Sequence, residues 1–61
     1  MGNPDLSIII NSSYAFIVRG IDYVNYSDAI KMASLKYEDF MRKSEGQLGE
    51  ISEIKIYEII G

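Results

Sequence analysis

The last stretch of the chain, residues 51–60, alternates apolar and polar side chains as a β-strand lying on a core does. On one face of this strand, Ile54 and Ile56 would meet the core. The opposite face is also apolar, through Ile51, Tyr57 and Ile59. Because a chain of 61 residues builds a single core, a strand with apolar side chains on both faces suggests a partner.

The small size of the chain points in the same direction. A folded domain of this size buries only ~60% of the surface that its unfolded chain exposes, so small domains commonly rely on disulfides, metals or oligomerisation. The sequence contains no Cys and no His, which excludes disulfides and thiolate metal sites and removes the commonest metal ligand. We therefore expect a homo-oligomer, most simply a symmetric dimer, without a metal or cofactor.

The N-terminal part of the chain predicts two strands joined by a short turn. Residues 6–10 contain three consecutive isoleucines, whose β-branched side chains favour a strand. Residues 11–13 are polar and have the length of a hairpin turn. Residues 14–19 alternate again and predict the second strand. Gly20 interrupts this strand with a bend, beyond which residues 21–24 could continue it.

A helical period begins after this second strand. Asn25 is suited to be the N-cap, with Asp28 at the third helical position as a weak capping box. Ser27 is the competing cap. Gly46 and Gly49 predict the end of the helix and a loop. The predicted core face of the helix consists of the side chains that fall within one arc of about 100°. These are Tyr26, Ile30, Ala33, Tyr37, Phe40 and Met41.

The element order is therefore β-β-α-β. It predicts a small α+β domain in which one helix packs on one face of a three-stranded sheet. We expect residues 1–5 to form a flexible N-terminal arm and residues 6–61 to form a single domain. The position at which the last strand joins the sheet stays open.

No grouping of residues has the spacing of a catalytic site. Without His, the serines lack the commonest general base, and the acidic residues are typical of solvated surface. The net charge of −3 disfavours nonspecific binding to nucleic acid. No apolar run approaches the ~20 residues that are needed to span a bilayer. The N-terminus lacks the basic segment of a secretory signal, so we expect a soluble cytoplasmic protein. Because no catalytic grouping is present, we expect that it is not an enzyme.

The helix carries a second candidate docking site. Met32 and Leu35 point away from the predicted core arc and have charged neighbours. Isolated exposed apolar residues are common, so an ordinary surface is the alternative interpretation.

The leading hypothesis is a small non-enzymatic protein that binds another protein, has a regulatory or accessory role, and forms a homodimer. The residues expected to bind a partner are Ile51, Tyr57, Ile59, Met32 and Leu35. The small size, isoleucine-rich composition and lack of catalytic groups are similar in style to accessory proteins of phages or mobile elements, a resemblance that no motif carries.

Two further hypotheses belong to other classes. The first is an acidic inhibitor of a nucleic-acid enzyme, in which carboxylates imitate phosphates. Its candidate residues are Glu50, Glu53 and Glu58. The second is a weak nucleic-acid-binding module that uses basic residues of the helix. These are Lys31, Lys36, Arg42 and Lys43.

Overall fold

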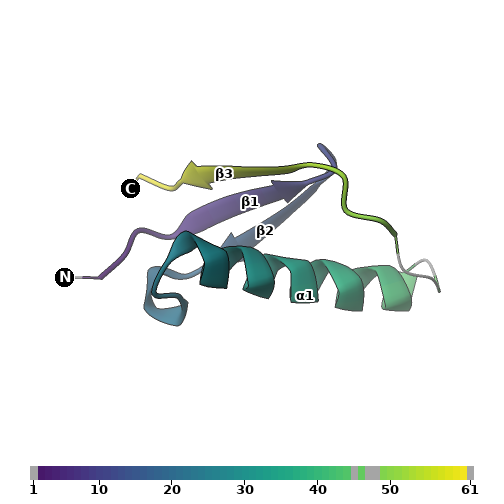
Figure 1. The fold of residues 1–61 in the computed structure, drawn as a ribbon, viewed down its shortest axis with the longest axis horizontal. Coiled ribbons are helices and arrows are strands. Elements are labelled where there is room, and N and C mark those ends of the chain that lie inside the picture. Colours follow the sequence, from purple (N-terminus) through teal and green to yellow (C-terminus); the bar gives the residue numbers. More distant parts are fainter. Residues whose placement is uncertain (1, 45, 47–48, 61) are drawn as a thin grey trace.

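The computed structural model describes residues 2–44, 46 and 49–60. It confirms the predicted α+β domain, with three strands in one sheet and one long helix (Figure 1). The elements in chain order are β1 (Leu6–Ile10), β2 (Tyr14–Val18), the 3-10 turn η1 (Gly20–Asp22), α1 (Tyr26–Ser44) and β3 (Ile54–Glu58).

The last strand joins the sheet on the far side of the first, which gives the order β2-β1-β3. Both neighbours of β1 are antiparallel to it, and Ile8 of β1 lies opposite Phe16 of β2 and Ile56 of β3. Leu6, Ile8 and Ile10 are fully buried because the central strand has a neighbour on each side and the helix on one face. β2 and β3 are therefore the two edges of the sheet.

The turn between β1 and β2 is tight. Asn11 and Ser12 have φ values of 54° and 61°, and the Ser13 amide donates to the Ile10 carbonyl at 3.3 Å. Positive φ at both central positions is characteristic of a type I′ hairpin turn, whose twist matches the strands that it joins. The left-handed region favours Asn among non-glycine residues, which suits the sequence at this position.

The expected continuation of the second strand over residues 21–24 is wrong. β2 ends at Val18, and η1 turns the chain toward the helix. Gly20 occupies a buried position against the backbone of Asn3, where a Cβ atom would overlap that residue's carbonyl group. The amide of Gly20 donates to the Asp5 carboxylate at 2.7 Å, which fixes the bend.

The N-terminal segment makes several polar contacts with the rest of the domain. The Asn3 amide donates to the Tyr23 carbonyl at 2.8 Å, and the Tyr23 hydroxyl donates to the Pro4 carbonyl at 2.6 Å. The Asp5 carbonyl accepts from the Ile59 amide at 2.9 Å. These contacts join residues 3–5 to η1 and to the end of β3; the flexibility of residues 1–5 stays a prediction.

The helix begins as predicted. The Asn25 side chain accepts from the Asp28 amide at 2.9 Å, which is the N-cap interaction. Every fourth residue of α1 is then buried: Ala29, Ala33, Tyr37 and Met41.

The predicted core face of α1 is correct in its middle and wrong at two positions. Tyr26 and Phe40 are 48% and 39% exposed, and Ala29, which the predicted arc omits, is fully buried. The reason is the position of the helix. α1 packs mainly against β2 and then β1. Phe40 lies over the edge strand β2, so its ring contacts Tyr14 and Phe16 but stays partly open to solvent. Tyr26 lies in the first turn, and its hydroxyl reaches Glu58 of the other edge strand.

β3 is shorter than the strand expected over residues 51–60. Just before β3, the Asn11 side-chain oxygen accepts hydrogen bonds from the backbone amides of Ser52 and Glu53, at 2.8 and 3.2 Å. Ser52 is therefore held by a side chain, and Glu53 is held both by that side chain and by the bond from the Asn11 amide to its carbonyl at 2.9 Å. Of the predicted loop after the helix, Gly46 has a φ of 72°, while residues 45, 47 and 48 lie outside the described residues.

Candidate protein-binding surface

The face of the sheet opposite the helix carries exposed apolar side chains. The strand register places its side chains in two rows. One row is Ile17, Ser7 and Tyr57, and the other is Ala15, Ile9 and Lys55. We call these residues the outer sheet face. Among the described residues, no helix or strand lies over it (Figure 1).

The large apolar side chains of this face are well exposed. Ile17 is 47% exposed on β2, and Tyr57 is 52% exposed on β3. They stand on either side of the small Ser7, about 10 Å apart across two strand spacings. Ile59 follows β3 and is 43% exposed. The large apolar side chains therefore surround the small Ser7 and offer apolar contact area to a partner.

Two of the residues predicted to bind a partner on the last strand are therefore exposed, Tyr57 and Ile59. The third, Ile51, is not: it is half-buried and packs against the core. The expectation that it faces outward with Tyr57 is wrong. Ile51 precedes the regular strand, where the chain turns under Asn11, so strand alternation does not govern its direction.

Of the two helix residues predicted to bind a partner, only one is well exposed. Leu35 is 65% exposed, whereas Met32 is half-buried and packs against the core. The expectation that both side chains face solvent is therefore wrong for Met32. Met32 lies one turn before Lys36, which reaches the Ile17 carbonyl of β2, so this side of the helix faces the sheet. Leu35 remains as an isolated exposed residue.

The inner side of β3 is only partly covered. Ile54 and Ile56 are half-buried and pack against the core, but α1 contacts β2 and β1 more extensively than β3. Sequence reasoning placed these two residues directly under the helix. It missed that β3 would be an edge strand beyond the helix, because the strand order could not be deduced from local periodicity.

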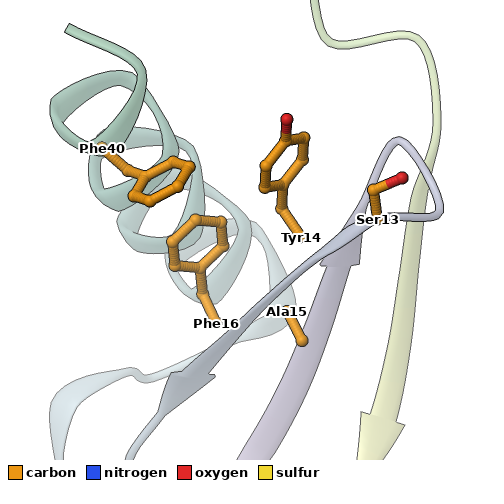
Figure 2. A pocket seen from close by; sticks show the side chains of 5 residues that line it. All are labelled: Ser13, Tyr14, Ala15, Phe16 and Phe40. Atoms are coloured by element: carbon orange, nitrogen blue, oxygen red, sulfur yellow. The ribbon is translucent and has the colours of Figure 1, made fainter. Parts of the chain in front are cut away.

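A shallow hollow of about 190 Å³ lies on the other side of the molecule, where β2 meets the helix. Its lining residues are Ser13, Tyr14, Ala15, Phe16 and Phe40. Figure 2 shows the rings of Tyr14 and Phe16 projecting from β2 toward Phe40 on the helix. Tyr14 and Phe40 have ring centroids 5.5 Å apart, a normal aromatic contact.

The chemistry of this hollow is limited. The Tyr14 and Ser13 hydroxyls are its polar side-chain groups, and none of the lining residues is acidic or basic. Tyr14 and Phe16 each also contact Tyr37, so the rings belong mainly to the helix–sheet packing. The hollow is a small apolar notch at the rim of the core, without an acid–base pair.

The acidic residues of the last strand are held separately. The Ser12 hydroxyl donates to the Glu53 carboxylate at 2.5 Å, and the Tyr26 hydroxyl donates to the Glu58 carboxylate at 3.0 Å. Glu53 and Glu58 are five positions apart along the extended chain, so their Cα atoms lie about 17 Å apart. The bond to Glu58 and the charge of Glu58 raise the pKa of Tyr26.

The basic residues of the helix are also distributed rather than gathered. Lys36 donates to the Ile17 carbonyl at 2.9 Å, which turns it toward β2. Lys43 pairs with Asp39 at 3.1 Å on the solvent side of the last turns. Within the part of the chain that the structure describes, no group of acidic residues has the geometry of a metal site.

Comparison of the chain with protein-family models, with curated proteins and with solved structures found no match. Among the described residues, α1 is too polar to cross a bilayer.

Proposed function

We propose that this chain is a small non-enzymatic protein-binding module, with an accessory or regulatory role, that acts as a homodimer in the cytoplasm. The observation that carries the proposal is the outer sheet face, where Ile17 and Tyr57 are each about half exposed. Contiguous apolar patches on small domains commonly mark protein–protein contacts.

The burial pattern supports a binding role for this face. A three-stranded sheet with one helix has enough apolar material for one core, and that core lies on the helix side, where Leu6, Ile8 and Ile10 are fully buried. Ile17, Tyr57 and Ile59 are additional to it. Covering each of them would contribute up to about 1.5–3 kcal/mol before the costs of association, reduced by the part already buried.

The two other hypotheses receive no specific support from the geometry. Phosphate mimicry favours carboxylates along one groove, whereas Glu53 and Glu58 are bound by different hydroxyl groups at opposite ends of β3. A nucleic-acid interface favours a continuous basic surface, whereas Lys36 and Lys43 are turned to separate partners. The protein-binding proposal therefore comes first.

The test is affinity capture with matched surface variants. Ile17→Lys alters the outer sheet face, and Leu35→Lys alters an exposed residue of the helix on the other side of the domain. We expect the parent and Leu35→Lys to capture the same protein and Ile17→Lys to lose it, while circular dichroism shows that all three chains are folded. Capture that is lost only with Leu35→Lys would move the site to the helix, and capture that survives both changes would contradict an apolar surface site.

A further inference from the structure

We propose that β3 pairs with β3 of a second copy, edge to edge and antiparallel. The two-fold axis passes between the two copies of Ile56, which lie opposite each other. This inference rests on the proposed homodimer and specifies how it forms. The two sheets would then become one continuous sheet, with both helices on the same side of it.

The hydrogen-bonding direction of each residue in β3 follows from two measured bonds. The Asn11 amide donates to the Glu53 carbonyl, and the Ile59 amide donates to the Asp5 carbonyl, both at 2.9 Å. Backbone groups in an antiparallel pair alternate between facing the partner and facing away. The odd-numbered residues from 53 to 59 therefore face β1, and the even-numbered ones, Ile54, Ile56 and Glu58, present their N–H and C=O groups outward.

The same alternation shows that the two edges of the sheet differ. On β2 the outward groups belong to Ala15 and Ile17, and the Ile17 carbonyl already accepts a hydrogen bond from Lys36 of the helix. Long side chains that cover an edge are a common protection against pairing. On β3, within the described residues, none of the turn, loop or side-chain hydrogen bonds reaches the backbone of Ile54, Ile56 or Glu58. β3 is therefore the more open of the two edges.

A two-fold pairing of this edge has few possible registers. Residues whose N–H and C=O groups point outward must lie opposite each other in the two copies. The two-fold axis therefore passes between the two copies of one residue, and the candidates are Lys55, Ile56 and Tyr57. An axis at Lys55 places two ammonium groups directly opposite each other, which is unfavourable. An axis at Tyr57 shifts the pairing beyond the end of β3. An axis at Ile56 aligns the whole strand, Ile54–Glu58, with its copy.

The side chains fit this register on both faces. On the helix side, the two half-buried Ile56 side chains become neighbours, and each covers the part of the other that α1 leaves open. On the outer face, Lys55 lies opposite Tyr57 of the second copy, so an alkyl stem packs on an aromatic ring and no like charges are directly opposed. The outer sheet face itself stays open and becomes continuous across the two copies.

Pairing of short strands alone buries less surface than a standard stable interface, so we expect a reversible dimer with a dissociation constant that is micromolar or weaker. Its formation is measurable by analytical ultracentrifugation over a range of protein concentrations. The first test compares two changes at one residue. Glu58→Ala removes the carboxylate but keeps the outward N–H, whereas Glu58→Pro removes both, at a strand end where proline is tolerated.

We expect Glu58→Ala to dimerise within about threefold of the parent and Glu58→Pro to be weakened about tenfold or more, because two symmetry-related hydrogen bonds are lost. Equal dissociation constants for the two variants would overturn pairing through the β3 edge. In that case a dimeric parent would still leave the proposed homodimer standing, whereas a parent that is monomeric at every concentration would overturn both.

The second test reads the register. Tyr57→Lys places a new ammonium group opposite Lys55 of the other copy and should abolish the dimer. Adding Lys55→Glu to this variant places a carboxylate opposite that ammonium group and should restore dimerisation at low salt. An axis at Tyr57, or stacking through the outer sheet face, predicts no restoration, so a double variant that stays monomeric would refute the register centred on Ile56.

Discussion

Asn11 is the residue whose replacement should reveal most about how the edge strand is held. Its side-chain amide donates to the Glu50 carbonyl at 2.8 Å and to the Tyr37 hydroxyl at 3.3 Å. Its side-chain oxygen accepts from the Ser52 and Glu53 amides at 2.8 and 3.2 Å. One side chain thus joins the hairpin turn, the helix and the segment that leads into β3.

The size of the effect follows from these bonds and from the backbone. Asn11→Gly keeps the left-handed conformation at φ 54° and removes the side-chain hydrogen bonds. Because the site is partly open to water, each bond should contribute near the low end of the usual range, for a total loss of about 2–4 kcal/mol. Asn11→Ala adds about 1 kcal/mol or more of strain at positive φ.

A loss of this size is large for such a small domain. Typical stabilities per residue correspond to about 3–9 kcal/mol for a chain of this length. We therefore expect Asn11→Gly to lower the melting temperature by about 10 °C or more and Asn11→Ala to lower it further, as followed by far-ultraviolet circular dichroism.

The matched control is Ser12→Gly. Ser12 also has a positive φ, and its side chain makes one hydrogen bond, to Glu53. The loss of that bond and the relief of backbone strain should nearly cancel, so this variant should melt within a few degrees of the parent. If Asn11→Gly melts at the same temperature as Ser12→Gly, the side-chain bonds of Asn11 do not stabilise the fold and the reasoning is refuted.

Three further predictions concern other parts of the molecule. Gly20→Ala should displace the N-terminal segment, because the new methyl group would overlap the carbonyl of Asn3, and faster hydrogen exchange of the Ile59 amide, which donates to the Asp5 carbonyl, with the helix signal retained is the expected result. Leu35→Lys should change the free energy of unfolding in urea by no more than about 0.5 kcal/mol, since this side chain is 65% exposed; a loss several times larger would mean that Leu35 is covered. The stability that the Tyr26 hydroxyl gains from Glu58 should be complete below pH 10.0 and be lost as pH rises through its elevated pKa, and Glu58→Ala should bring that pKa, followed by NMR titration, back toward 10.0.

Local chemistry in the sequence was sufficient to predict where most elements begin. The run of isoleucines at Leu6–Ile10 and the Asx cap at Asn25 each act within a few residues, so their consequences can be deduced without the rest of the chain. The helical period likewise identified Ala33 and Tyr37 as buried.

The wrong predictions all depend on contacts between distant parts of the chain. The place of β3 beside β1 is set by pairing across more than forty residues, and the strand order in turn decides how far α1 is displaced toward β2. This position of α1 partly buries Met32, and it leaves Phe40, which contacts Tyr14 and Phe16 of the edge strand β2, 39% exposed. Ile51 is turned inward by Asn11, a residue that appeared in the sequence only as part of a polar turn.

The same long-range arrangement links the fold to the proposed pairing. Since α1 covers β2 and β1 better than β3, the last strand is held mainly by its ladder with β1 and by polar contacts at its two ends. Asn11 fixes the approach to the strand, and the bond between Ile59 and Asp5 fixes its exit. An edge that is well positioned but incompletely covered costs little conformational entropy to pair, because its backbone is already extended before the second copy arrives.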